Sequence, residues 1–357
     1  MQVQAGEGRT TVRPEMDVRA AERFCLDILP AVSRTFALSI KVLPGDLGRS
    51  VLAAYLICRI ADTIEDEPSM PAVSKAELLD RLLECLWDDG AATSLAPRLG
   101  ALTGDPAHVR LAANTDVVFT LYHALPHASR DVVGEWVAEM VRGMRKFVLQ
   151  YPNGIRIQTL DEYKEYCYYV AGTVGYMLTD LWREHTPSIG AETYARLRER
   201  CRAFAEALQT VNILKDVAQD AEHENSIYVP ERALAEQGSG HATILAPQFL
   251  QQNVAALREL VQLAWSDLDD ALAYLLMLPR RAVSIRLFCV LPLLFAFATM
   301  RVLNGSTAML TPGGKVKISR REVKSLLVAG ALLVMSNSGV RWLVERVRSR
   351  AFVLGGA

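Results

Sequence analysis

The sequence predicts an all-α protein made of a single domain. Apolar residues recur every three or four positions nearly throughout the chain, as in "AELLDRLLECLWDD", while strand-like alternation is almost absent. Prolines and glycines at the breaks divide the chain into roughly ten to twelve helices. No linker rich in Ser, Gly or Pro separates a second domain, and no repeat of the solenoid kind occurs. We therefore expect a flexible polar tail over residues 1–18 and one helical domain over residues 19–350.

The composition is that of a folded and nearly neutral protein. Hydrophobic residues make up 51% of the 357 positions, which is enough to bury a sizeable core. The 39 basic and 40 acidic residues give a net charge of -1, and no basic block occurs, so we expect no nucleic-acid partner. The six cysteines lie mostly within apolar helical patterns and form no CxxC pair. We expect them to be reduced core residues of a cytoplasmic protein.

One apolar run resembles a membrane segment but is short. It extends from Leu287 to Met300, lies between Arg286 and Arg301, and contains Pro292. A bilayer core requires about 20 apolar residues, so we expect a buried helix rather than a membrane span. The polar N-terminus lacks the apolar region of a signal peptide.

A first acidic patch, "ADTIEDE", ends an otherwise apolar helical pattern. Asp62, Glu65 and Asp66 are spaced i, i+3, i+4, so their carboxylates project from one helix face. Arg59 and Tyr55 lie on the same face one and two turns earlier. Like charges at this spacing repel each other, so the patch is expected to bind something positive.

A second polar stripe occurs in "LQTVNILKDVAQDAE". Gln209, Asn212, Asp216 and Asp220 follow one another at steps of three, four and four residues, within one narrow helix face. The opposite face is expected to be apolar, with Leu208, Val211, Leu214 and Val217. Such a helix suits the wall of a water-containing cavity in a helical bundle.

The two patches together indicate a metal site for a phosphorylated ligand. Mg²⁺ prefers oxygen ligands and usually sits between one or two carboxylates and a substrate phosphate. Ser33, Arg34, Arg59 and Lys215 are the candidates to complete a phosphate site, since Arg offers a planar fork of donors. For Lys215 a salt bridge to an acid is the favoured interpretation. The alternative for both patches is a solvated surface face.

A third segment, "EYCYYVAGTVGYMLTDLW", combines tyrosines with glycines. Tyr166, Tyr169 and Thr173 are predicted to share a helix face, while Gly172 and Gly175 remove bulk nearby. Each glycine costs a helix about 1 kcal/mol relative to alanine, so two need a reason. Close helix packing is one reason; the other is a thin wall beside an apolar ligand, with tyrosine faces that can stabilise a carbocation.

With these three segments in this order along the sequence, the chain resembles the squalene and phytoene synthase family of head-to-head prenyl transferases, and most closely its squalene synthase branch. The matching pieces are "SRTFALSI", "YLICRIADTIEDE", "YCYYVAGTVGYM", "QTVNILKDVAQD" and a C-terminal "GGKVKIS". The resemblance extends over about residues 20–345. It implies an isoprenoid synthase helical bundle with a central cavity, in which Mg²⁺ bridges two acidic motifs to diphosphate.

The resemblance also implies individual roles. The metal ligands would be Asp62, Glu65, Asp66, Asp216 and Asp220, and the four aspartates would thereby serve catalysis. Tyr169 would act near the first chemical step. The substrate would contact Ser33, Arg34, Phe36, Tyr55, Arg59, Tyr166, Gln209 and Asn212, with Phe36 on a mobile segment that helps to close the pocket.

The implied reaction joins two farnesyl diphosphates through presqualene diphosphate to squalene, with hydride from NADPH. No Rossmann pattern is present, so NADPH follows from the resemblance alone. Lys315 and Lys317 are candidates to meet its phosphates, with a solvated basic loop as the alternative. We expect a monomer.

Two departures from the family pattern stand out. Gln219 replaces a glutamate of the second acidic motif, which lowers the number of metal-binding carboxylates expected there. We also expect no C-terminal membrane anchor of the kind found in eukaryotic squalene synthases, and therefore a protein that is soluble or only loosely associated with a membrane.

Three alternatives stay open. A sister synthase would stop at presqualene diphosphate, release hydroxysqualene, or form phytoene, without reduction by NADPH. A terpene cyclase is less favoured because its second motif normally places Ser or Thr where Asp216 stands. A non-catalytic helical scaffold is the alternative from another class.

Overall fold

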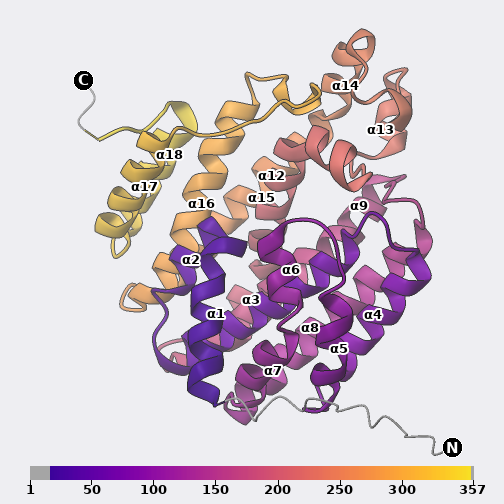
Figure 1. The fold of residues 1–357 in the computed structure, drawn as a ribbon. Helices are drawn as coiled ribbons and strands as arrows, with labels where there is room; N and C mark the ends of the chain where they lie inside the picture. Colours follow the sequence, from indigo (N-terminus) through magenta and orange to yellow (C-terminus); the bar gives the residue numbers. More distant parts are fainter. Residues whose placement is uncertain (1–16, 355–357) are drawn as a thin grey trace, which may run out of the picture.

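The computed structural model describes residues 17–354, apart from the side chain of Arg34, and these residues form a bundle of α-helices (Figure 1). Within them no strand occurs, and the only β-type pairing is an isolated bridge between Arg156 and Ile227. The predicted all-α class is confirmed. The helices are α1 (Val18–Val32), α2 (Arg34–Ile40), α3 (Gly45–Glu65), α4 (Ala72–Glu84), α5 (Ala91–Leu99), α6 (Pro106–Ala112), α7 (Thr115–His123), α8 (His127–Gln150), α9 (Leu160–Cys167), α10 (Thr173–His185), α11 (Ala191–Arg198), α12 (Cys201–Gln219), α13 (Glu231–Glu236), α14 (Leu250–Ala256), α15 (Arg258–Met277), α16 (Val283–Leu303), α17 (Arg320–Leu333) and α18 (Asn337–Ser349).

The eighteen α-helices of this part of the chain exceed the roughly ten to twelve predicted. Several breaks carry no glycine or proline. One example is the single turn at Ala113 and Asn114 that separates α6 from α7. In addition, two π-helices, η1 (Tyr168–Gly172) and η2 (Asp220–Glu224), interrupt segments that a periodic pattern predicts as continuous.

Two long helices run through the interior of the bundle. α3 packs against α1, α7 and α8, while α12 packs against α10, α15 and α16. Between residues 51 and 65 of α3 only Tyr55, Arg59 and Asp62 keep partial exposure, and all other side chains are buried. This part of α3 is therefore packed in the core on every side except along the narrow stripe formed by these three residues.

The glycines of the third segment serve close helix packing. A Cβ atom on Gly175 would lie 2.2 Å from the carbonyl oxygen of Cys201, and one on Gly172 would lie 2.8 Å from Glu206 Oε1. Both contacts are with α12. The packing interpretation of these glycines is therefore the one that the structure supports.

The apolar run around Pro292 belongs to α16, a longer helix than predicted. α16 has 21 residues and is long and apolar enough to cross a membrane, and 72% of its most apolar window is buried within the protein. Arg286, fully buried, donates hydrogen bonds to the carbonyl oxygens of Leu275, Leu278 and Val334. The length argument against a span was wrong, because flanking residues extend the helix, but the expected burial is observed.

The ends of the domain differ slightly from the predicted boundaries. α1 begins at Val18, so the last residue of the expected tail is helical, while residues 1–16 lie outside the described part. After α18 the chain continues to pack: Phe352 is buried, and its N–H donates to Glu322 Oε1 at 3.0 Å. All six cysteines are free and buried, as predicted.

Candidate active site

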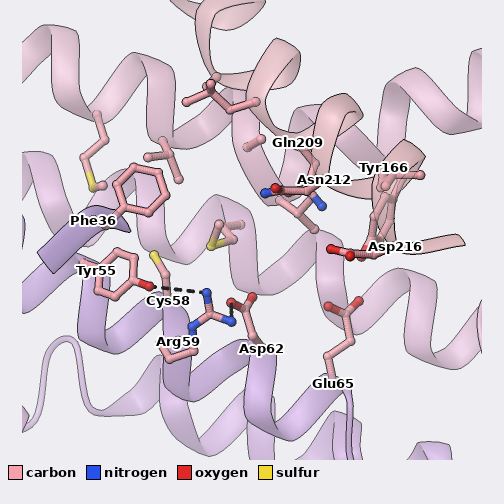
Figure 2. Close-up of a pocket in the computed structure, with 18 of the residues that line it drawn as sticks. Phe36, Tyr55, Cys58, Arg59, Asp62, Glu65, Tyr166, Gln209, Asn212 and Asp216 are labelled. Carbon is pink, nitrogen blue, oxygen red and sulfur yellow. Dashed lines mark hydrogen bonds and ion pairs between the residues drawn. The ribbon is translucent and has the colours of Figure 1, made fainter. Parts of the chain in front are cut away.

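A cavity of about 400 Å³ lies between α3 and α12. Figure 2 shows Asp62 and Glu65 of α3 pointing toward Asp216 of α12 at one end, with Phe36 and Tyr55 at the other end. The apolar part of the lining includes Phe36, Val51, Met177, Leu178, Phe204 and Phe288. The cavity thus has one charged end and one hydrocarbon-lined end.

Eleven of the predicted site residues line this cavity: Phe36, Tyr55, Arg59, Asp62, Glu65, Asp66, Tyr166, Gln209, Asn212, Asp216 and Asp220. Because the two acidic patches share one cavity, they are not separate solvated surface faces. Glu67, the last acid of "ADTIEDE", turns away instead and accepts hydrogen bonds from Ser69 and Thr103.

The α3 carboxylates have few positive partners. Arg59 Nη1 lies 3.2 Å from Asp62 Oδ2, and Arg59 Nη2 is 3.4 Å from the Tyr55 hydroxyl. Lys75 donates to the backbone carbonyl of Glu65 rather than to its carboxylate. Glu65 is only 8% exposed, and its Oε1 atom has no hydrogen-bond partner. An unpaired buried carboxylate oxygen is costly unless a cation binds it.

Burial and mutual repulsion raise the pKa of these acids. Burial is the main cause of the raised pKa values of Asp62, Glu65 and Asp66, and for Glu65 the charges of Asp66 and Asp62 add to it. On the facing helix, burial and the charges of Asp216 and Asp66 raise the pKa of Asp220 to about 8. Hydrogen bonds have the opposite effect on the neighbouring Glu67, whose pKa is lowered by its contacts with Ser69 and Thr103.

The second polar stripe is broader than predicted. Lys215 forms a salt bridge with Asp216, as the favoured interpretation predicted, and it also lines the cavity. Leu208 also lines the cavity, whereas Val211, Leu214 and Val217 are buried behind it. The face that α12 turns toward the cavity therefore includes Leu208 and Lys215 in addition to the predicted polar stripe.

One cavity carboxylate was missed by the sequence analysis. Glu224 lines the cavity together with Asp216 and Asp220, and burial, followed by the charges of Asp220, Asp216 and Asp62, raises its pKa to about 7. Gln219 is exposed and does not belong to the lining. The departure at Gln219 therefore does not remove a carboxylate from the cavity. The four-residue step from Asp216 to Asp220, continued once more, would have found Glu224.

The tyrosines do not share a face as predicted. Tyr166 lines the cavity and stacks on Tyr228, with ring centroids 5.0 Å apart. The π-helix η1 then changes the angle between successive side chains, so that Val170, Ala171 and Val174 form the wall.

Tyr169 lies outside the cavity lining. A Cβ atom on Gly143 of α8 would lie 2.0 Å from its ring, and Lys146 Nζ lies 6.0 Å from its ring centroid. The catalytic role of Tyr169 stays a prediction.

Three further candidates, Ser33, Lys315 and Lys317, are not among the lining residues. The Ser33 hydroxyl accepts a hydrogen bond from the N–H of Phe36 at 3.1 Å and so caps α2. Arg34 is the first residue of α2, but its side chain lies outside the described part. Lys315 and Lys317 are exposed on a coil segment, which is held near η2 by a hydrogen bond from the N–H of Gly313 to Glu222.

The acidic end suits a metal that bridges protein and substrate. No group of three His, Cys, Asp or Glu residues in the described chain is arranged to hold a metal ion by itself. Mg²⁺ typically completes its shell with waters and substrate phosphates, so facing carboxylates of which one has an unsatisfied oxygen fit it.

The model of the squalene/phytoene synthase family matches residues 29–322. The chain belongs to this family. It is 27% identical to squalene synthase 1 of Arabidopsis thaliana, over 83% of this chain and 68% of the relative. It is 29% identical to the squalene synthase of Ganoderma lucidum, over 87% of this chain and 66% of the relative. The chain thus covers about two thirds of the length of these relatives.

Solved structures of the family confirm the isoprenoid synthase fold. A complex of TcSQS with a ligand superposes with a TM-score of 0.78 at 25% identity, and the match covers 94% of both chains. A dehydrosqualene synthase in complex with a ligand shares the fold, with a TM-score of 0.54 at 20% identity.

The raised pKa of Asp220 predicts a pH-dependent stability of the metal-free protein. Burial and the neighbouring acids raise the pKa of Asp220 from 3.8 to about 8 on folding, so the folded state binds more protons between these values. Stability contributed by this group therefore falls as pH rises through that window. In EDTA, urea unfolding should show that the Asp220→Asn variant gains stability over the wild type between about pH 5 and about pH 8. A difference that is constant with pH would contradict the shift.

Proposed function

We propose that this protein is a squalene synthase that condenses two farnesyl diphosphates with Mg²⁺ and NADPH. The observation that carries the proposal is the cavity itself: two facing rows of carboxylates at one end and apolar walls at the other, in a chain of this family. The charged end suits diphosphate with its metal ions, and the apolar end suits prenyl chains.

The residues of the charged end have complementary tasks. Asp62, Glu65, Asp66, Asp216 and Asp220 would hold Mg²⁺, which supplies positive charge to the departing diphosphate. Arg59, whose pKa is raised by the neighbouring Asp62 and Tyr55, adds a charged donor to the same end. Stabilising the leaving group in this way promotes ionisation of the allylic carbon–oxygen bond.

The residues of the apolar end protect the cation that forms. Phe36 packs against Tyr55 and Phe288, with ring centroids 5.6 and 6.4 Å apart, and so closes this end with aromatic surface. Such walls exclude water, which would otherwise quench the cation before the second prenyl chain captures it. Ring faces such as that of Tyr166 can also stabilise positive charge directly.

Product analysis tests the function. Purified protein is incubated with farnesyl diphosphate and Mg²⁺, with and without NADPH, and the extracted hydrocarbons are identified by mass spectrometry. We expect squalene only with NADPH, and an Asp216→Asn variant at least about 100-fold less active, because a metal ligand is lost. Glu77→Gln, an exposed acid of α4, is the control. A C30 product formed equally without NADPH would instead indicate a sister synthase, and no product would contradict the proposal.

The predicted contact of NADPH with Lys315 and Lys317 can be tested separately. Both side chains are exposed on the segment that Gly313 links to Glu222 of η2, where they could meet phosphates of the nucleotide. We expect a Lys315→Ala/Lys317→Ala variant to raise the KM for NADPH about tenfold while presqualene diphosphate formation is unchanged. An unchanged KM for NADPH would contradict a contact between NADPH and these two lysines.

We further propose that this protein is cytoplasmic and monomeric, and that it contacts membranes peripherally through its α17–α18 hairpin. The hairpin lies at one edge of the molecule, beside α16 (Figure 1). Val328, Leu332 and Met335 occupy one face of α17 and its end, and they are 50%, 77% and 54% exposed. Exposed Arg321 and Lys324 continue this face toward the start of α17. An apolar face with flanking basic residues is complementary to an anionic lipid surface.

Vesicle co-sedimentation tests the membrane contact. We expect the wild type to bind vesicles with anionic lipid more tightly than neutral ones. A Val328→Glu/Leu332→Glu variant should bind at least about tenfold more weakly, since it loses apolar area and adds repulsion. Val73→Glu removes an equally exposed apolar residue of α4 and serves as control. Equal binding of all three proteins would contradict this docking face. The proposed monomeric state is tested separately, by measuring the molar mass of the lipid-free protein by light scattering.

A further inference from the structure

One carboxylate of the cavity lies outside both acidic motifs. We propose that Glu224 is a further ligand of the metal–diphosphate complex, and that η2 is the device that places it there. This inference rests on the proposed function, because it assigns an additional residue to the same site. Three observations support the proposal: the position of Glu224 in the cavity, the geometry of η2, and the unpaired carboxylate oxygen of Glu65 on the facing helix.

The π-helix changes where Glu224 points. In a regular α-helix each step of four residues advances the side chain by about 40°, so Asp216, Asp220 and Glu224 would fan progressively away from one line. The wider turn of η2 rotates the chain less per residue and opposes this drift. As a result Glu224 remains in the cavity lining with the two aspartates, while Glu222 is exposed.

The turn that follows η2 is held firmly. Asn225 has φ +50°, in the left-handed region that asparagine tolerates better than most residues. Its side chain donates to the carbonyl of Asn153 at 2.7 Å and accepts from Arg156 at 2.6 Å. The neighbouring Gly154 has no room for a Cβ atom, which would lie 1.9 Å from the Asn225 carbonyl oxygen. The backbone beside Glu224 is therefore fixed by a separate segment of the chain.

The Glu224 side chain has no structural task of its own. Within residues 17–354 no hydrogen bond or ion pair holds its carboxylate. Most buried acids are paired; Glu67, which anchors the turn at Thr103, is an example in this protein. An acid that lines a cavity and has no protein partner is available to a ligand in that cavity.

A second acid in the cavity supports the same conclusion independently. Glu65, on the facing helix, is more than nine-tenths buried and its Oε1 atom has no partner. The described lining holds six carboxylates, those of Asp62, Glu65, Asp66, Asp216, Asp220 and Glu224. It holds only two cationic side chains, Arg59 and Lys215. The excess of negative charge is suited to more than one divalent cation.

The experiment measures metal binding without turnover. Mn²⁺ replaces Mg²⁺ as the probe, inorganic diphosphate replaces the substrate, and free Mn²⁺ is followed by electron paramagnetic resonance. We expect Glu224→Gln to weaken Mn²⁺ binding in the presence of diphosphate by about tenfold or more. Glu222→Gln makes the same change of charge on the same π-helix, at an exposed side chain, and should bind as the wild type does.

Thermal unfolding separates a ligand from a structural residue. Without metal, Glu224→Gln should have a Tm equal to or above that of the wild type, because an unpaired acid is removed; with Mn²⁺ and diphosphate its Tm should rise less. A lower Tm without metal, or wild-type Mn²⁺ affinity, would overturn the role of Glu224. A wild type that binds no Mn²⁺ with diphosphate would overturn the metal assignment as a whole, and the wild-type titration alone reveals that outcome.

Discussion

The constraint on which the site depends is the repulsion between carboxylates held at close quarters in a partly buried cavity. In the described lining six acids face two cations, and Glu65 Oε1 has no partner, so the described residues do not satisfy all of these carboxylates. The helices cannot relieve this repulsion by moving apart. Their outer faces are fixed in the core by fully buried residues such as Leu56, Ile57 and Ile60 of α3. Hydrophobic packing therefore maintains an electrostatic arrangement that a divalent cation and a diphosphate complete.

The same packing gives the cavity its polarity from end to end. On α3 the stripe that stays partly exposed changes from Tyr55 to Arg59 and then to Asp62 within two turns. Phe36 and Phe288 extend the apolar end beyond Tyr55. A substrate with a charged head and a hydrocarbon chain can lie in this cavity in only one direction, which keeps the reacting carbon near the metal-binding end and away from bulk water.

The sequence predicted those parts of the site that depend on regular helical geometry. The spacing of Asp62, Glu65 and Asp66 on α3, and of Gln209, Asn212 and Asp216 on α12, places them correctly because both segments are α-helical with one apolar back. Predictions made across the two π-helices were less accurate. Tyr169 was expected beside Tyr166 but packs against Gly143, and Glu224 was not considered at all. The four-residue step from Asp216 and Asp220 leads to Glu224 in the sequence, but a single sequence carries no periodic signal for a wider turn, so the displacement of Tyr169 appears only in the structure.

The location of these turns is informative. A π-helix turns less per residue than an α-helix, and such turns are frequent at functional sites. η2 ends the helix whose buried face is formed by Val211, Leu214 and Val217, and the chain after it pairs with the segment at Ile155, whose carbonyl oxygen accepts from the N–H of Ile227 at 2.8 Å. None of the residues of η2 is buried in the core. η2 contributes Asp220 and Glu224 to the cavity lining, so a change in the geometry of this turn would move two of the six cavity acids.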